Sequence, residues 1–138
     1  MNAWIQAARP LAHVNIVVPL LLGHAAAWHV TRQFSFPWLV GALVWGVLDH
    51  LFVMFANDYA DRHTDTGART LVSGGSGVIQ EGKLSPKHLG TAAKTAGATL
   101  LVYSLAMTAL GRAWVPLYGL AALLLMWLYS FPPLRLSF

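Results

Sequence analysis

Residues 36–65 read FPWLVGALVWGVLDHLFVMFANDYADRHTD. From residue 36 to residue 56 the stretch is apolar apart from Asp49 and His50. A membrane-spanning helix needs about 20 mainly apolar residues, and this run has that length. At Asn57 the composition changes abruptly, and acidic residues follow at short intervals. The stretch therefore predicts a spanning helix with a polar cluster at its end.

Other parts of the chain have a similar composition. Four segments are long and apolar enough to be spans, namely residues 11–30, 36–56, 91–110 and 113–131. The third is rich in Ala, Gly and Thr, so we expect it to pack closely against its neighbours. The sequence thus predicts an all-α fold, a polytopic transmembrane bundle of four spans that forms a single domain over residues 1–138.

The composition excludes several other classes of protein. The chain is 57% hydrophobic and 10% charged, whereas about 25% of the residues of a soluble domain are charged. It has no cysteine, which excludes disulfides and thiolate metal sites. The net charge of +4 comes from basic residues that flank apolar runs, which indicates membrane topology rather than binding to nucleic acid.

The basic residues are distributed unequally between the two predicted sides. The side with the N-terminus, the long loop and the C-terminus carries Arg9, Arg62, Arg69, Lys83, Lys87, Lys94 and Arg135. The other side carries only Arg32 and Arg112. By the positive-inside rule, we expect the N-terminus and the loop 57–88 to be cytoplasmic in an integral membrane protein.

The strongest chemical signal is the cluster of Asn57, Asp58, Asp61 and Asp65. On a continuous helix the three aspartates would share an arc of about 60°, and Asn57 would widen it to about 100°. Three carboxylates on one face repel one another, so a cation is expected between them, and oxygen ligands suit Mg²⁺. A solvated acidic helix end is the alternative. It is disfavoured because the chain has only two other acidic residues and because the cluster adjoins a span.

A glycine-rich stretch follows the aspartates. Residues 73–77 read SGGSG, and residues 81–86 read EGKLSP. Backbone N–H groups of such a stretch can bind an anion, and Lys83 would add a cation for a phosphate. A flexible loop without a ligand is the alternative. Ser85 and Pro86 have the pattern of a helix cap followed by a first-turn proline.

Two further groups are candidates for contact with a substrate. Tyr129, Ser130 and Arg135 flank the prolines that end the fourth span, and they could lie level with the aspartates. The alternative is a helix terminator with an interfacial tyrosine and a topogenic arginine. Arg9, which precedes Pro10, either marks a helix start or contacts a phosphate.

The chain resembles the UbiA-type intramembrane prenyltransferases. Residues 57–65 match their NDxxDxxxD motif. The glycine-rich stretch and the Tyr-Ser-x-Pro-Pro-x-Arg-Leu stretch at 129–136 follow in the family's order. The loop is most similar to members of the branch that prenylates 1,4-dihydroxy-2-naphthoate in menaquinone synthesis, as against ubiquinone synthesis.

The resemblance implies a fold of about nine helices around a central cavity in the bacterial inner membrane. It also implies a second aspartate-rich motif, so we expect this chain to be a truncated N-terminal half that needs its C-terminal half for turnover. The implied reaction transfers an isoprenyl group from a prenyl diphosphate to an aromatic acceptor with Mg²⁺. Asp58, Asp61 and Asp65 would be catalytic and would bind the metal with Asn57. Arg9, Asn57, Lys83, Tyr129, Ser130 and Arg135 would bind substrate.

Two other classes of protein are alternatives. CDP-alcohol phosphotransferases also have aspartates at a membrane helix end, but they need Asp-Gly-x-x-Ala-Arg, and here Tyr59 follows Asp58. The second alternative is a non-catalytic membrane fragment or scaffold that binds a cation or a diphosphate without turnover. Membrane lipid would surround the chain in either case.

Overall fold

The computed structural model describes residues 2–64, 75–131 and Leu134, and these residues are helical without any strand. The elements in chain order are α1 (Ala3–Ala8), the 3₁₀ helix η1 (Pro10–His13), α2 (Val14–Thr31), α3 (Phe36–Ala60), α4 (Pro86–Ala109) and α5 (Val115–Ser130). The prediction of an all-α fold is confirmed for this part of the chain.

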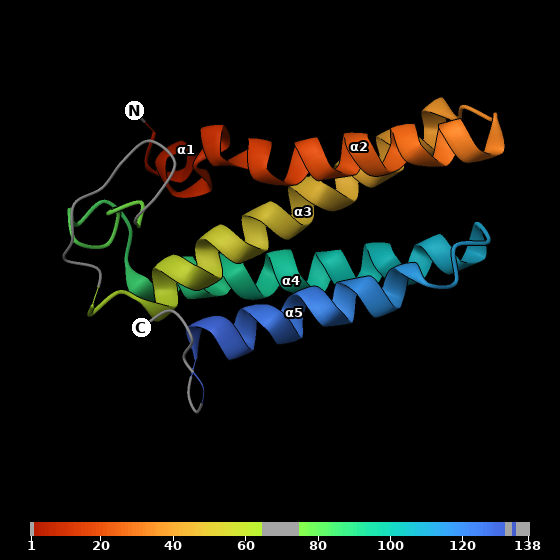
Figure 1. Ribbon diagram of the computed structural model, residues 1–138. Helices are drawn as coiled ribbons and strands as arrows, with labels where there is room; N and C mark the ends of the chain where they lie inside the picture. Colours follow the sequence, from red (N-terminus) through yellow and green to blue (C-terminus); the bar gives the residue numbers. More distant parts are fainter. Residues whose placement is uncertain (1, 65–74, 132–133, 135–138) are drawn as a thin grey trace.

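The four long helices run lengthwise beside one another (Figure 1). The N-terminus, the end of α3, the start of α4 and the end of α5 lie together, and we call this the aspartate end. The connections 32–35 and 110–114 lie at the opposite end, which we call the turn end. The structure thus groups the N-terminus, the two described ends of the long connection and the end of α5, as the sequence predicts.

Prolines and polar caps determine where the helices begin. Arg9 has a left-handed backbone (φ 47°) that ends α1, and Pro10 opens η1. The backbone N–H of His88 donates to Ser85 Oγ at 3.2 Å, and Pro86 occupies the first turn, so the predicted cap of α4 is confirmed. That helix begins five residues before the predicted 91, because its first turn is polar and lacks the apolar composition that predicts a span.

The close packing predicted for the third span is seen between α3 and α4. The buried residues of α4 are Leu89, Gly90, Ala93, Ala96, Gly97, Leu100 and Ser104, which form one helical stripe of mostly small side chains. A Cβ placed on Gly97 would lie 3.0 Å from the Phe52 ring, and one on Gly90 would lie 3.0 Å from the Tyr59 ring. Small residues therefore allow α4 to approach the aromatic side chains of α3.

The main apolar core lies at the aspartate end. Its buried members are Ala7, Phe55, Ala56, Val78, Leu89, Ala93 and Met126. They come from α1, α3, the segment before α4, α4 itself and α5. The core therefore fixes the relative positions of the five segments that surround the aspartates.

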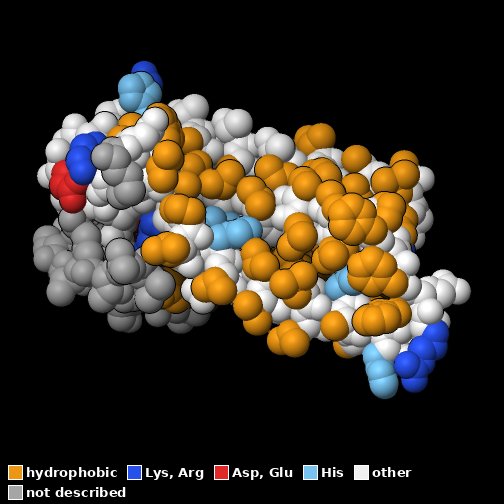
Figure 2. Space-filling model, turned by 90° about the horizontal axis from the view of Figure 1, so that it is seen from above, with side chains coloured by type: hydrophobic (Ala, Val, Ile, Leu, Met, Phe, Trp, Pro, Cys, Tyr) orange, Lys and Arg blue, Asp and Glu red, His pale blue; other side chains and the backbone are white. Residues whose placement is uncertain are grey.

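The outside of the molecule is apolar along the length of the helices. In Figure 2 hydrophobic side chains cover the visible face between charged groups at the two ends. Val30, Leu22 and Val102 are 80%, 66% and 66% exposed, for example. Figure 2 thus shows a surface of the kind that lipid would cover.

Within residues 2–64 and 75–131, two helices are long and apolar enough to cross a membrane, by length and composition. They are Phe36–Ala60 and the segment Ala3–Thr31, which joins α1, η1 and α2. Only 22% and 6% of the residues in their most apolar windows are buried. A core helix of a soluble protein would be mostly buried instead. Helix α5 is equally apolar but shorter, with 16 residues.

Candidate functional site

Helix α3 ends inside the aspartate cluster. Its last residue is Ala60, and Asp61 is the C-cap residue with φ −89° and ψ 8°. The Asp61 carbonyl accepts from the backbone N–H of Thr64 at 2.9 Å and from its hydroxyl at 3.3 Å, a local turn that competes with the helix. Helix α3 therefore ends before Asp61 and does not continue through the three aspartates as the sequence predicts. Asp58 is on the helix, Asp61 is in the turn, and Asp65 lies outside the described residues.

Asp58 holds the glycine-rich stretch against the end of α3. Its carboxyl group is buried, with 6% of the residue exposed. Oδ1 accepts from the backbone N–H of Ser76 at 3.1 Å, and Oδ2 accepts from the Ser76 hydroxyl. A buried carboxylate needs such donors, because burying it without partners is very costly. The structure therefore brings Asp58 together with Ser76 of the glycine-rich stretch, and the sequence predicts that the aspartates and this stretch act together.

A polar network extends from Ser76 to α1. Gln6 Nε2 donates to the Ser76 carbonyl at 2.9 Å and to Glu81 Oε2 at 3.1 Å. Lys83 Nζ donates to Gln6 Oε1 at 2.8 Å and lies 2.6 Å from Glu81 Oε2. The predicted phosphate ligand Lys83 is thus already paired, but its side chain is 43% exposed. An exposed ion pair is worth about 0–1 kcal/mol, so exchanging it for a phosphate would cost little.

Ser130 joins α5 to the same end. The Ser130 hydroxyl donates to Asn57 Oδ1 at 3.2 Å, and Ser130 is 2% exposed. The predicted approach of Ser130 to the aspartate motif is confirmed. Tyr129 is adjacent, and it is 49% exposed. Arg135 lies outside the described residues.

Two arginines, Arg9 and Arg62, lie at helix ends at the aspartate end of the molecule. Arg9 is the boundary between α1 and η1, which agrees with the helix-start interpretation; its contact with a phosphate stays a prediction. Arg62 was not predicted as a site residue. Its guanidinium lies 4.4 Å from the centre of the Tyr59 ring and donates to the Tyr59 carbonyl at 2.6 Å. A cation thus follows Asp61 directly in the turn.

Gln6 and Ser76 are the residues of this end that sequence reasoning missed or undervalued. Ser76 is part of the glycine-rich stretch, but the sequence predicts no partner for its hydroxyl. Gln6 is 70 residues away from Ser76 in the chain, and no spacing pattern connects the two. A polar glutamine among the otherwise apolar residues of Ala3–Ala8 was the available signal.

No family model, characterised protein or solved structure matches this chain. The chemistry of the aspartate end is therefore inferred from its residues and their geometry.

The donors at the aspartate end suit one hard cation. Within residues 2–64 and 75–131, no group of three or more His, Cys, Asp or Glu side chains could hold a metal ion. Asp58, Asp61 and the amide oxygen of Asn57 nevertheless belong to one helix end. Mg²⁺ is usually bound by one or two carboxylates and by substrate phosphates, so these donors fit it once a diphosphate is present. A carboxylate has about four acceptor sites, so Asp58 keeps acceptor capacity beside Ser76.

Proposed function

We propose that this chain forms part of an intramembrane prenyltransferase that transfers an isoprenyl group from a prenyl diphosphate to an aromatic acceptor with Mg²⁺. The observation that carries the proposal is the pairing of Asp58 with Ser76. It brings Asp58, from a motif of the kind that binds metal ions, and Ser76, from a stretch of the kind that binds anions, to one helix end. The kind of reaction is inferred from the resemblance of residues 57–65 to the motif of the UbiA-type prenyltransferases.

The same end holds donors and acceptors of complementary kinds. Asp58 and Asp61 supply carboxylates for a cation, with Asn57 beside them. Lys83 supplies a partly exposed ammonium, and Arg62 supplies a guanidinium beyond Asp61. A diphosphate would need both the cation and the basic groups, because charge-assisted hydrogen bonds to phosphate are strong and directional.

The residues have separate tasks in this reaction. Asp58 and Asp61 would hold the Mg²⁺, which neutralises charge that develops on the departing diphosphate. Lys83 would leave Glu81 and donate to a diphosphate oxygen. Ser76 and Ser130 would position Asp58 and Asn57 through the hydrogen bonds seen here. Electrostatic stabilisation of the leaving group would be the main source of rate enhancement.

We place all four long helices across the membrane as part of this proposal. The exposed apolar surface and the two helices of spanning length support it. The aspartate end would face the cytoplasm, as the distribution of basic residues indicates. The prenyl tail would stay in an apolar environment, because each buried CH₂ is worth about 0.8 kcal/mol relative to water.

A second function is favoured by one observation. Both oxygens of the Asp58 carboxylate already accept from Ser76. An aspartate held in this way can be a structural anchor, and the chain would then be a membrane scaffold that binds a cation or a diphosphate without turnover. The two functions make different predictions for Asp61, whose backbone forms the turn and whose side chain belongs to the proposed metal site.

Prenyl transfer over a Mg²⁺ titration separates the two functions. The substrates would be a labelled prenyl diphosphate and either 1,4-dihydroxy-2-naphthoate or 4-hydroxybenzoate, with protein that includes any C-terminal half. We expect Asp61→Asn to lose most turnover while the protein inserts and folds normally. Near-normal rates for Asp61→Asn at low Mg²⁺ would contradict the role of Asp61 in a metal site, and absence of turnover by the unmodified protein would contradict the enzyme proposal.

A further inference from the structure

A cavity lies at the turn end, far from the aspartates. Its volume is about 410 Å³, which is within the usual range for ligand sites of about 300–1,000 Å³. Its walls come from α2, α3, α4 and α5 and from the turn before α5. Gly41 on this wall is about 25 Å from Asp58 along α3, at about 1.5 Å per residue. The cavity is therefore a separate feature from the proposed diphosphate site.

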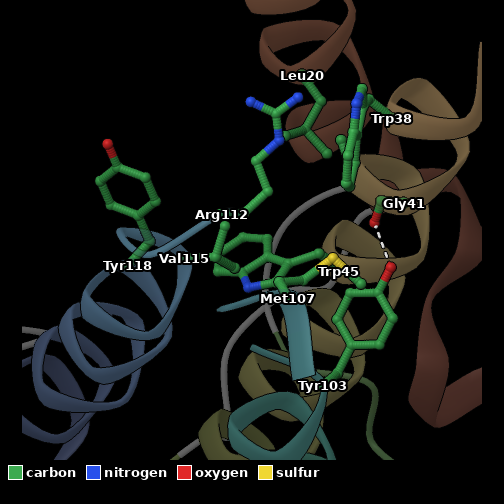
Figure 3. A pocket seen from close by; sticks show the side chains of 10 residues that line it. Leu20, Trp38, Gly41, Trp45, Tyr103, Met107, Arg112, Val115 and Tyr118 are labelled. Atoms are coloured by element: carbon green, nitrogen blue, oxygen red, sulfur yellow. Dashed lines mark hydrogen bonds between the residues drawn. The ribbon is translucent and has the colours of Figure 1, made fainter. Parts of the chain in front are cut away.

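Four aromatic residues line the cavity, and two of them, Trp45 and Tyr103, bond their polar atoms within the protein. Trp45 Nε1 donates to Ser104 Oγ at 3.0 Å, and the Tyr103 hydroxyl donates to the Gly41 carbonyl at 2.9 Å (Figure 3). The rings thus present carbon to the cavity, and Met107 adds a flexible apolar wall. Such a lining suits a hydrocarbon chain rather than a polar ligand.

One cation borders this apolar space. The Arg112 guanidinium lies 4.1 Å from the centre of the Trp38 ring, and Figure 3 shows its side chain reaching toward that ring. A contact with an aromatic ring uses none of the five N–H donors of a guanidinium as a conventional hydrogen bond, so they stay available to an oxygen acceptor. In the described part of the chain, Arg112 has no ion pair or side-chain hydrogen bond.

The turn end has no acidic residue to neutralise this cation. All five acidic residues of the chain lie between Asp49 and Glu81, and the segments 1–48 and 82–138 contain none. Arg32 and Arg112 are therefore the only formal charges near the two turns. An anion to complement Arg112 has to come from outside the chain.

We propose that the turn-end cavity binds a hydrocarbon chain of an anionic phospholipid, whose phosphate contacts Arg112. An apolar cavity alone does not select a ligand in a membrane, because lipid tails are as apolar as the cavity wall. The charge of the headgroup beside Arg112 therefore determines selectivity. A neutral phospholipid would lack the net negative charge that Arg112 complements.

Quenching of tryptophan fluorescence by brominated lipid chains tests this site. The whole chain would be reconstituted in phosphatidylcholine vesicles that contain a small fraction of brominated phosphatidylglycerol or brominated phosphatidylcholine. Two tryptophans, Trp38 and Trp45, line the cavity. We expect brominated phosphatidylglycerol to associate about fivefold more strongly, since one arginine near the surface contributes about 1 kcal/mol toward an anionic lipid.

Arg112→Gln should reduce this preference to less than about twofold. The matched control is Arg32→Gln, which removes the other cation of the turn end from a position outside the cavity and should keep the preference. Ala42→Leu fills the cavity without changing any charge, and it should lower quenching by brominated phosphatidylglycerol. If circular dichroism shows that Arg112→Gln does not fold, the result for Ala42→Leu still tests whether the lipid chain occupies the cavity.

Four outcomes would overturn the proposal. The two brominated lipids could quench the unmodified chain equally. Arg32→Gln could abolish the preference as fully as Arg112→Gln, which would indicate general attraction to the charged surface. Ala42→Leu could leave quenching unchanged. Sedimentation could show a dimer whose cavity tryptophans are quenched by neither lipid, and the cavity would then be assigned to contact with a second copy of the chain.

Discussion

Ser76→Ala should destabilise the aspartate end. The change removes the hydroxyl that donates to Asp58 Oδ2 and keeps the backbone N–H that donates to Oδ1 at 3.1 Å. Asp58 is only 6% exposed, so water cannot easily replace the lost donor. A hydrogen bond to a charged group contributes about 1.5–3 kcal/mol. We therefore expect the free energy of unfolding to fall by about 2 kcal/mol, roughly a 30-fold change in the folding equilibrium constant.

The assay is equilibrium unfolding of the detergent-solubilised chain, followed by circular dichroism. Ser35→Ala is the matched control, because Ser35 makes no capping hydrogen bond through its side chain at the start of α3. It should change the free energy of unfolding by less than about 0.5 kcal/mol. A double-mutant cycle with Asp58→Asn should then give a coupling energy above about 1 kcal/mol, since the two residues share a network. Equal, small effects of Ser76→Ala and Ser35→Ala would refute the pairing.

The helix packing and the topology give further predictions. Gly97→Val should lower the free energy of unfolding by about 1–3 kcal/mol in the same assay, because the added atoms meet an aromatic ring of α3. Gly23→Ala should not lower it, because no atom lies within 4 Å of the Cβ position of Gly23. Ser85→Ala should cost about 0.5–2 kcal/mol and increase hydrogen exchange in the first turn of α4, and unchanged exchange would argue against the cap. Reporter fusions at Arg32 and at Gly77 should report opposite sides of the membrane, with Gly77 cytoplasmic, and an external Gly77 reporter would reject the topology.

The sequence predicts the helices well because their composition is extreme. Long apolar runs leave few alternatives, and the small residues of α4 indicate its close packing with α3. Ser85 and Pro86 also predict the start of α4 from local chemistry alone. These features depend on neighbours along the chain, and the sequence presents those neighbours directly.

The site is less predictable because its contacts are distant in the chain. The aspartate spacing fits a helix, but the turn formed by Asp61 and Thr64 ends α3 first. The bonds from Gln6 to Ser76 and from Ser130 to Asn57 join residues more than 60 positions apart. The turn-end cavity likewise needs four helices in place before it exists. Such contacts are consequences of the packed bundle.

The central claim is that Asp58 and Asp61 bind a divalent cation together with a diphosphate. Electron paramagnetic resonance of Mn²⁺, used in place of Mg²⁺, measures this binding without requiring turnover. With inorganic diphosphate present, we predict that the purified chain removes Mn²⁺ from the free signal, and that Asp61→Asn weakens this binding at least tenfold while its circular dichroism is unchanged. Equal Mn²⁺ binding by the unmodified chain and by Asp61→Asn, with or without diphosphate, would contradict the account.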